Sequence, residues 1–207
     1  MFITFEGPEG AGKSTQVRLL ADHLRQQGQA VVVTREPGGT PIGDQIRHVL
    51  HSTDNTAMAP TAEMLLYAAS RAQLVSEVIR PALAAGSIVL CDRYADSTMA
   101  YQGYGRGLDR DMLAALTEIA TGGLAPDLTL FLDLDVERGL ARRRNEGEEM
   151  NRLDLEALDF HRRVRTGYQK LAAAEPGRWC RLDADQPAQA VQAEIRQVVA
   201  RRMAAQR

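Results

Sequence analysis

The chain has 207 residues, of which 44% are hydrophobic, so it can bury a substantial core and fits one α/β domain of ordinary size. Lysine and arginine total 25, and aspartate and glutamate total 27, so the formal net charge is -2 and no overall basic field favours nucleic acid as a partner. No stretch is apolar for long enough to span a bilayer, and no basic N-terminal segment or cleavage site is present, so we expect a cytoplasmic protein without a membrane partner.

The first predicted element is a buried strand over residues 2–5, and it leads into a glycine-rich loop. The loop reads Gly7-Pro8-Glu9-Gly10-Ala11-Gly12-Lys13-Ser14-Thr15 and opens a predicted helix over residues 13–27. A G-x-x-x-x-G-K-S run between a strand and a helix is typical of a phosphate-binding loop, whose N–H groups wrap an oligophosphate. Lys13 would reach the β and γ phosphates of the nucleotide, and the Ser14 hydroxyl would bind Mg²⁺. The alternative is a strand–helix turn in which the glycines only avoid steric clashes and Lys13 is an exposed charge.

A second strand is expected over residues 30–34, and the order strand, helix, strand predicts a parallel sheet with helices on both faces. Residues 35–40 read Arg-Glu-Pro-Gly-Gly-Thr, a loop at the carboxyl end of that strand. Ligands of open α/β sheets bind at this edge. Arg35 is therefore expected beside the phosphate-binding loop, where an anion is available.

Helices are expected next over residues 42–50 and 61–85, with Pro81 bending or dividing the second. The apolar stripe of the second helix is too wide for a surface helix, which places the helix in the core or in a subunit interface. A third strand over residues 88–91 runs directly into Asp92 and Arg93. A carboxylate at the tip of a buried strand beside a phosphate loop is typical of the acid near Mg²⁺, and a simple helix cap is the alternative.

Residues 95–107 carry polar and aromatic side chains among glycines, which is typical of a recognition surface and unusual for a core. The remaining predicted elements are helices over 109–121, 136–144, 154–174 and 187–203 and strands over 128–132 and 179–182. Between two of these helices lies a charged stretch, which we expect to be either a solvated loop or a mobile lid over about residues 141–152. The whole chain, residues 1–207, is thus predicted to be a single P-loop domain with a five-stranded parallel sheet.

Several cations are expected to follow strands at the carboxyl edge, which favours a second phosphate-bearing substrate. Phosphoryl transfer needs positioning and charge neutralisation by Mg²⁺, a lysine and arginines, and it needs no side-chain nucleophile. A P-loop switch or a partitioning ATPase is the alternative of another class.

We expect the histidines to be surface or structural residues: His23, His48, His51 and His161. The two cysteines, Cys91 and Cys180, lie far apart beside apolar residues, which favours a reducing compartment.

Four motifs, at residues 7–15, 34–40, 92–94 and 97–103, together resemble bacterial thymidylate kinases in order and spacing. The resemblance covers essentially the whole chain, and it implies transfer of the γ-phosphoryl group of ATP to dTMP with Mg²⁺ as the cofactor. Together with the apolar length of the helix at residues 61–85, it also implies a homodimer formed through that helix and its neighbours. Another nucleoside monophosphate kinase is the alternative within the same fold.

The resemblance assigns ATP to residues 7–15 and Mg²⁺ to Ser14 and Asp92. It gives as catalytic residues Lys13, Asp92, Arg93, Arg142, Arg143 and Arg144. It gives as dTMP-binding residues Glu9, Arg35, Pro37, Tyr67, Arg71, Arg93, Thr98, Tyr101 and Gln102. In the family that the chain resembles, the catalytic arginine comes either from the phosphate-binding loop or from the lid. Positions 8–11 of the loop are not basic here, so the resemblance implies that the lid supplies it, and Arg152 is a further candidate there.

Within the acceptor site, the resemblance places Tyr67 against the thymine ring and Arg71, one helical turn later, at the edge of the base. Without the resemblance, these two residues would be an interior aromatic and an exposed cation. Glu9 would face the 3′ hydroxyl of the sugar, and Tyr101 would occupy the space that a ribose 2′ hydroxyl needs.

Overall fold

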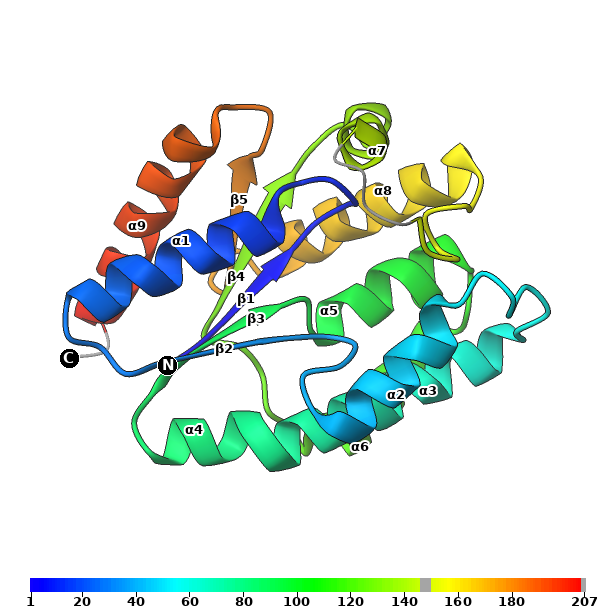
Figure 1. Ribbon diagram of the computed structural model, residues 1–207, viewed down its shortest axis with the longest axis horizontal. Helices are drawn as coiled ribbons and strands as arrows, with labels where there is room; N and C mark the ends of the chain where they lie inside the picture. Colours follow the sequence, from blue (N-terminus) through cyan, green and yellow to red (C-terminus); the bar gives the residue numbers. More distant parts are fainter. Residues whose placement is uncertain (146–149, 206–207) are drawn as a thin grey trace.

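The computed structural model describes residues 1–145 and 150–205, and its centre is one five-stranded sheet (Figure 1). The strands are β1 (Phe2–Glu6), β2 (Val31–Arg35), β3 (Ile88–Asp92), β4 (Leu128–Asp133) and β5 (Trp179–Asp183). Their order is β2-β3-β1-β4-β5, and every neighbouring pair is parallel. The predicted five-stranded parallel sheet is therefore confirmed.

Each strand ends one residue later than the apolar pattern predicts, and each of these last residues is charged. They are Glu6, Arg35, Asp92, Asp133 and Asp183. The hydrophobic run stops one residue before backbone pairing does. Because the strands are parallel, all five charged residues lie at the same edge of the sheet.

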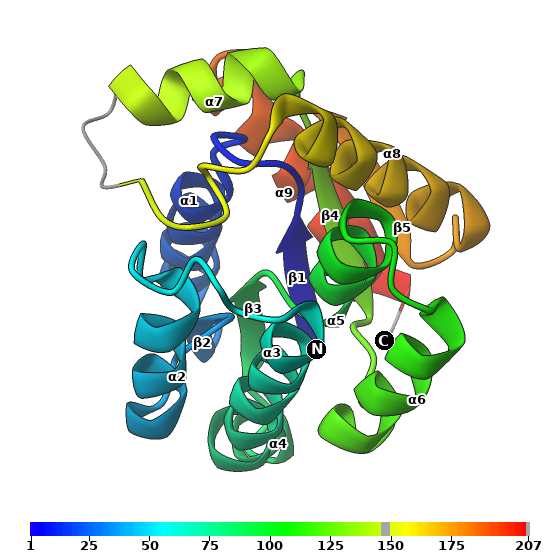
Figure 2. The ribbon, with the colours of Figure 1, turned by 90° about the vertical axis from the view of Figure 1, so that its right-hand side faces the viewer.

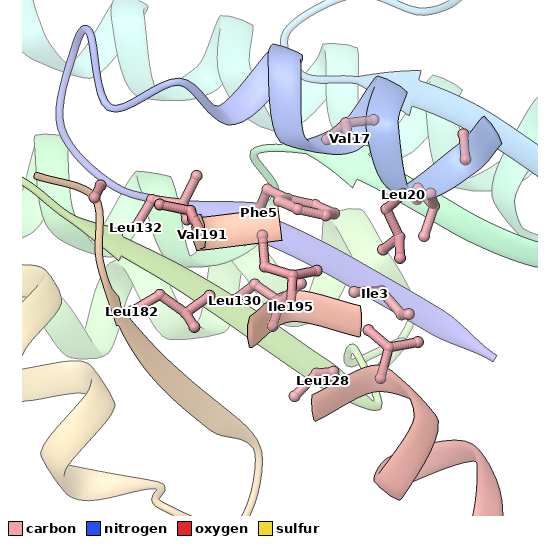
Figure 3. Packing of buried hydrophobic residues seen from close by; sticks show 14 of the residues in the cluster. Ile3, Phe5, Val17, Leu20, Leu128, Leu130, Leu132, Leu182, Val191 and Ile195 are labelled. Carbon is pink, nitrogen blue, oxygen red and sulfur yellow. The ribbon is translucent and has the colours of Figure 1, made fainter. Parts of the chain in front are cut away.

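Helices α1 (Lys13–Gln26) and α9 (Ala188–Ala205) cover one face of the sheet. Figure 3 shows the core beneath them, where Ile3 and Phe5 of β1 pack with Leu20 of α1 and Ile195 of α9. Alternate residues of a strand point to opposite faces. Glu6 therefore points to the other side of the sheet from Phe5.

The other face is covered by a long interrupted helix and by α8 (Leu158–Ala174). The interrupted helix consists of α3 (Pro60–Leu74), a π-helical segment η1 (Val75–Ile79) and α4 (Arg80–Ala84). The irregularity precedes Pro81, which has no N–H to bond to the preceding turn, so the prediction of a helix disturbed by this proline is confirmed. Beside it lie α5 (Ala95–Thr98) and the π-helical η2 (Met99–Gly105).

Three further helices surround this layer (Figure 2). Helix α2 (Pro41–His51) packs on α3, and α6 (Arg110–Thr121) packs on α3 and η2. Asp109 caps α6 by accepting from the Met112 N–H at 2.8 Å, as the sequence predicts. Helix α7 (Val136–Asn145) lies across the end of the sheet at which β1 meets its loop.

Two segments differ from the sequence-based expectation. Residues 95–105 are helical and largely buried, and the glycines among them serve packing: a Cβ at Gly105 would lie 2.7 Å from the Phe160 ring. The helix expected from residue 154 begins only at Leu158, because the Asn151 side chain accepts from the N–H groups of Leu153 and Asp154 and makes a turn there.

In the described part of the chain, no helix is both long enough and apolar enough to cross a membrane. Both cysteines are free, with Cys91 buried in β3 and Cys180 partly buried in β5. Part of the expected lid, residues 146–149, lies outside the described residues.

Candidate active site

The loop after β1 has the backbone geometry of a phosphate-binding loop. Gly7, Gly10 and Gly12 have φ angles of 144°, 67° and 82°, which side-chain-bearing residues rarely adopt. Gly12 ends the loop in the left-handed conformation and α1 begins at Lys13, so the first N–H groups of α1 face the loop. The predicted order of strand, loop and helix is present, and it forms a concave cluster of donors suited to phosphate.

Helix α7 packs directly on this loop, backbone against backbone. A Cβ at Gly10 would overlap the carbonyl oxygen of Gly139, and a Cβ at Gly139 would overlap the carbonyl oxygen of Glu9. Gly139 is thus a contributor to the site that the sequence analysis missed. A helical glycine alone gives no signal of such a contact, since only the packing of α7 creates it.

Lys13 and Ser14 lie at the start of α1, directly beside β3. Lys13 is 7% exposed, and its ammonium donates to the carbonyl groups of Pro8 and Gly7 at 2.7 and 3.1 Å. Burial, with Arg93 nearby, lowers the pKa of Lys13 to about 8. The Ser14 hydroxyl donates to Asp92 Oδ2 at 2.5 Å, so the two side chains expected to share a metal ion lie in direct contact.

Arg93 occupies the centre of the site in a strained backbone conformation. Its φ of 69° makes it the one non-glycine residue with positive φ among the described residues. Its guanidinium donates to the Gly7 carbonyl at 3.0 Å and to Glu9 Oε1 at 2.9 Å, and it lies over the Tyr101 ring. Arg93 therefore connects the phosphate-binding loop to the space beside it.

Glu9 accepts from both Arg93 and the Tyr101 hydroxyl, the latter at 2.7 Å. Burial alone would raise the pKa of Glu9, but the charges of Arg93 and Lys13 and the hydrogen bond from Tyr101 together hold it well below its usual range. Glu9 is thus an ionised acceptor at the floor of the site.

A cavity of about 240 Å³ extends from the loop toward α2, α3 and η2. It is lined by all nine residues that the sequence assigned to an acceptor, namely Glu9, Arg35, Pro37, Tyr67, Arg71, Arg93, Thr98, Tyr101 and Gln102. It is also lined by residues that the analysis did not assign, namely Glu36, Arg47, His51, Ser97, Asn151 and Leu153. These come from four separate segments of the chain. Glu36 and Ser97 lie within the motifs at residues 34–40 and 97–103, but the sequence did not indicate that either lines the cavity.

Arg71 is buried rather than exposed. It is 2% exposed and forms an ion pair with Glu36 at 2.7 Å, and it also donates to the carbonyl of Tyr94 at 3.2 Å. Burial alone would lower the pKa of Arg71, but the charge of Glu36 and its hydrogen bond raise it, so the guanidinium stays charged. Glu36 Oε1 and the Thr98 hydroxyl are buried in the cavity wall without a protein partner. Unsatisfied polar atoms in a cavity wall favour a polar ligand there.

The loop after β2 contributes less charge to the cavity than expected. Arg35 is exposed and pairs with Asp44 at 3.3 Å, and such an exposed pair contributes little to stability. The Pro37 carbonyl accepts from Arg47 of α2 at 3.0 Å. Arg47 thereby presents a cation to the cavity that the sequence analysis did not identify.

The candidate lid arginines point in different directions. Arg142 donates to the Ala184 carbonyl and to Asp185 Oδ1, which directly follow β5. Arg143 lines the cavity and is bonded to Asp154 at 2.8 Å. Arg144 is exposed on α7.

Arg152 is buried and bound to α2 and α3. It pairs with the Glu63 carboxylate and donates to the Leu50 carbonyl at 3.1 Å. Glu63 also accepts from Gln102 and Arg106, so one buried carboxylate ties three segments together. These contacts give Arg152 a structural role at the cavity wall.

One of the four histidines, which we expected to be surface or structural rather than catalytic, lies at the cavity. His51 lines it, and burial, with Arg47 nearby, lowers the pKa of His51 to about 4. The ring is therefore neutral at neutral pH.

Among the described residues, no group of three or more His, Cys, Asp or Glu side chains is arranged to hold a metal ion. A metal at this site would be held by few protein oxygens together with phosphate oxygens, which is how Mg²⁺ is commonly bound at nucleotide sites. The Ser14 hydroxyl and the Asp92 carboxylate are suitable oxygen donors for it.

Comparisons with known proteins agree on one family. A family model described as thymidylate kinase matches residues 5–195. The chain is 57% identical to a thymidylate kinase of Trichlorobacter lovleyi, over 93% of this chain and 94% of that protein. It is 54% identical to one of Roseiflexus sp., over 96% and 93% respectively. The crystal structure of thymidylate kinase from Ehrlichia chaffeensis superimposes with a TM-score of 0.78 and 33% identity, covering 97% of this chain and 98% of that one.

Proposed function

The chain belongs to the thymidylate kinase family and transfers the γ-phosphoryl group of ATP to dTMP, and we propose that the cavity beside the phosphate-binding loop holds the acceptor. One observation carries this proposal. The cavity is bounded by Lys13 and Ser14 where the donor phosphates would lie, and by Tyr67 and Gln102 at its far side. Donor and acceptor phosphates can therefore meet within one cavity, as direct transfer requires.

On the donor side, residues 7–15 would hold the ATP phosphates through backbone N–H groups and the start of α1. Lys13, now bonded to two loop carbonyls, would donate to the β and γ phosphates instead. Phosphoryl transfer is catalysed by positioning and charge neutralisation. The buried ammonium would therefore neutralise negative charge on the phosphoryl group during its transfer.

Mg²⁺ would be held by Ser14 and Asp92 together with phosphate oxygens, because the two side chains offer hard oxygen ligands in direct contact. When bound, it would neutralise charge on the β and γ phosphates. The contribution of the chain is to hold these two oxygen donors at the end of β3 and the start of α1.

On the acceptor side, Arg93 is proposed to bind the dTMP phosphate and the group in transfer. It lies between the Gly7 carbonyl and Glu9, so a phosphate entering there would meet its guanidinium first. Arg143 is the best-placed lid arginine, because it lines the cavity while Arg142 faces Asp185. The segment of about residues 141–152 is accordingly proposed as the lid of a single domain.

At the far side, Tyr67 would stack on thymine, and Gln102 and the unpartnered Thr98 hydroxyl would bond to polar atoms of the base. Arg71 would contact the edge of the base while Glu36 keeps it charged and fixed. Tyr101, held by Glu9, would occupy the space of a 2′ hydroxyl and so favour deoxyribose.

An assay coupled to ADP release, run with ATP and a panel of nucleoside monophosphates, tests the acceptor. We expect dTMP to give the highest kcat/KM, and a preference for dAMP, CMP or UMP would refute the assignment of the cavity.

Tyr101→Ala should reduce the ratio of dTMP to ribothymidine monophosphate turnover. An unchanged ratio would refute the steric role of Tyr101.

We also propose that the chain forms a homodimer. Large apolar side chains are exposed on neighbouring helices, with Leu65 of α3, Met112 of α6 and Ile119 of α6 exposed by 51%, 42% and 80%. Large apolar side chains exposed on two helices that pack together favour association. Sedimentation at working concentration measures the state, and a monomer there would refute the dimer. The free thiols fit a cytoplasmic location.

A further inference from the structure

Glu6, the last residue of β1, is completely buried on the sheet face covered by α5 and α8. It does not line the cavity, and the reaction proposed above gives it no role. A carboxylate without access to water must be compensated by hydrogen-bond donors. The identity of these donors therefore indicates what the residue does.

Three donors converge on the Glu6 carboxylate. The Tyr94 backbone N–H donates to Oε1 at 2.8 Å, and the hydroxyls of Ser97 and Tyr168 donate to Oε2 at 2.6 and 2.9 Å. Tyr94 directly follows Arg93, the residue with the strained φ of 69°. Oε1 thus anchors the chain immediately after the strained position, which must be held by its surroundings.

The same two hydroxyls contact the guanidinium of Arg93. Arg93 Nη1 lies 3.0 Å from the Tyr168 oxygen and 3.4 Å from the Ser97 oxygen. A hydroxyl has one hydrogen to donate and two lone pairs that accept. The Ser97 and Tyr168 oxygens also lie 2.8 Å from each other. Burial raises the pKa of Glu6 to about 7, and at a pH above this Glu6 is ionised and can only accept. When both hydroxyl hydrogens point to it, oxygen lone pairs are left to accept from Arg93 Nη1. Glu6 therefore sets the polarity of the hydrogen bonds that hold the guanidinium.

We propose that Glu6 is a positioning residue for phosphoryl transfer, acting through Tyr168, Ser97 and the Tyr94 backbone to hold Arg93 in its reactive orientation. The inference rests on the function proposed above for Arg93. It adds a residue, outside the cavity and at the end of the central strand, on which turnover depends. Tyr168, itself fully buried and stacked on Phe131, is the rigid intermediary.

A purely structural role would be that Glu6 only ties α5 and α8 to the sheet. Glu6→Gln separates the two roles because glutamine has the same shape but offers one acceptor and one donor group. If the amide oxygen faces the hydroxyls, the NH₂ group opposes the Tyr94 N–H. If the NH₂ group faces the hydroxyls, it uses lone pairs that Arg93 needs. Either orientation loosens Arg93 while the packing volume is unchanged.

The experiment compares steady-state kinetics of wild type, Glu6→Gln, Tyr168→Phe, the double variant and Arg93→Ala, with folding checked by circular dichroism and Tm. Asp133→Asn is the matched control, because Asp133 is a buried carboxylate at the end of the neighbouring strand whose partners, Arg165 and Arg181, lie outside the cavity lining. Should Glu6→Gln not fold, Ser97→Ala and Tyr168→Phe carry the same test.

The assay is run at a pH well above 7, where Glu6, whose pKa is raised to about 7, is ionised in the wild type. There we expect Glu6→Gln to lower kcat by about 10- to 100-fold with KM for ATP changed by less than about threefold. The double variant should lose less than the product of the two single losses, because both act on one network. A kcat for Glu6→Gln within about twofold of wild type, or equal to that of Asp133→Asn, would overturn the inference. Near-normal turnover of Arg93→Ala would instead overturn the role proposed for Arg93, and the inference with it.

Discussion

The free energy of unfolding should depend on pH through His51 and through Glu6, in opposite directions. Replacing either residue by glutamine should remove its part of that dependence. Burial, with Arg47 nearby, lowers the pKa of His51 to about 4 from 6.5. Burial raises the pKa of Glu6 to about 7 from 4.5, with Asp96 adding to the rise and Arg93 opposing it. The charged groups that act on His51 are Arg47, Glu9, Arg93 and Arg143.

The signs follow from which state binds protons more tightly. The folded-state pKa of His51 is depressed, so its contribution to stability is fully present above pH 6.5 and is lost as the pH falls through about 4. The folded-state pKa of Glu6 is raised, so its contribution is fully present below pH 4.5 and is lost as the pH rises through about 7. Each difference of about 2.5 pH units corresponds to about 3 kcal/mol. Between pH 4.5 and 6.5 the two effects oppose each other in the wild type.

Urea unfolding of the ligand-free protein between pH 4 and 8, followed by Trp179 fluorescence, measures both effects. Trp179 is the single tryptophan and is 6% exposed, so its emission reports loss of the core. Relative to wild type, His51→Gln should gain about 3 kcal/mol on going from pH 7 to pH 4, and Glu6→Gln should gain as much in the opposite direction. His48→Gln, on the exposed side of α2, controls for loss of an imidazole. Curves for His51→Gln and Glu6→Gln that stay parallel to wild type would refute the reasoning.

Three further substitutions test contacts in the site. Gly139→Ala adds about 1 kcal/mol of helix propensity, but its Cβ would overlap the Glu9 carbonyl. We therefore expect a net loss of about 1–3 kcal/mol in the free energy of unfolding, together with weaker ATP binding. A Tm above that of wild type would contradict the close contact. Glu36→Gln leaves the buried Arg71 without its countercharge and should cost about 3 kcal/mol in urea unfolding, whereas unchanged stability would argue against a buried ion pair. Ser14→Ala should raise the Mg²⁺ concentration for half-maximal rate by about tenfold, and an unchanged requirement would exclude Ser14 as a ligand.

Sequence patterns were most informative where the geometry is local. The glycine-rich loop is specified by neighbours along the chain, since its glycines supply the positive φ angles and Lys13 and Ser14 follow at once. The same holds for the Asp109 cap of α6 and for the disturbance before Pro81. Strand ends were misplaced by one residue because hydrophobicity reports burial and not backbone pairing.

Local sequence patterns did not predict the contacts between segments that are far apart in the chain. The composition of residues 95–107 suggested a surface, but the glycines there admit α8, and most of the segment is core. His51 is unremarkable in sequence and reaches the cavity only because α2 packs on α3. Gly139 matters only because α7 lies on the loop.

The amino-acid sequence by itself determined the parallel α/β sheet, the phosphate-binding loop and the family, because these depend on periodicity and on short spacings. The tertiary structure alone decided how the arginines are distributed, with Arg142 on Asp185, Arg143 at the cavity and Arg152 on Glu63. It also decided that Glu6 supports Arg93. A charged side chain takes the countercharge that folding brings near it, and that partner lies tens of residues away in the chain.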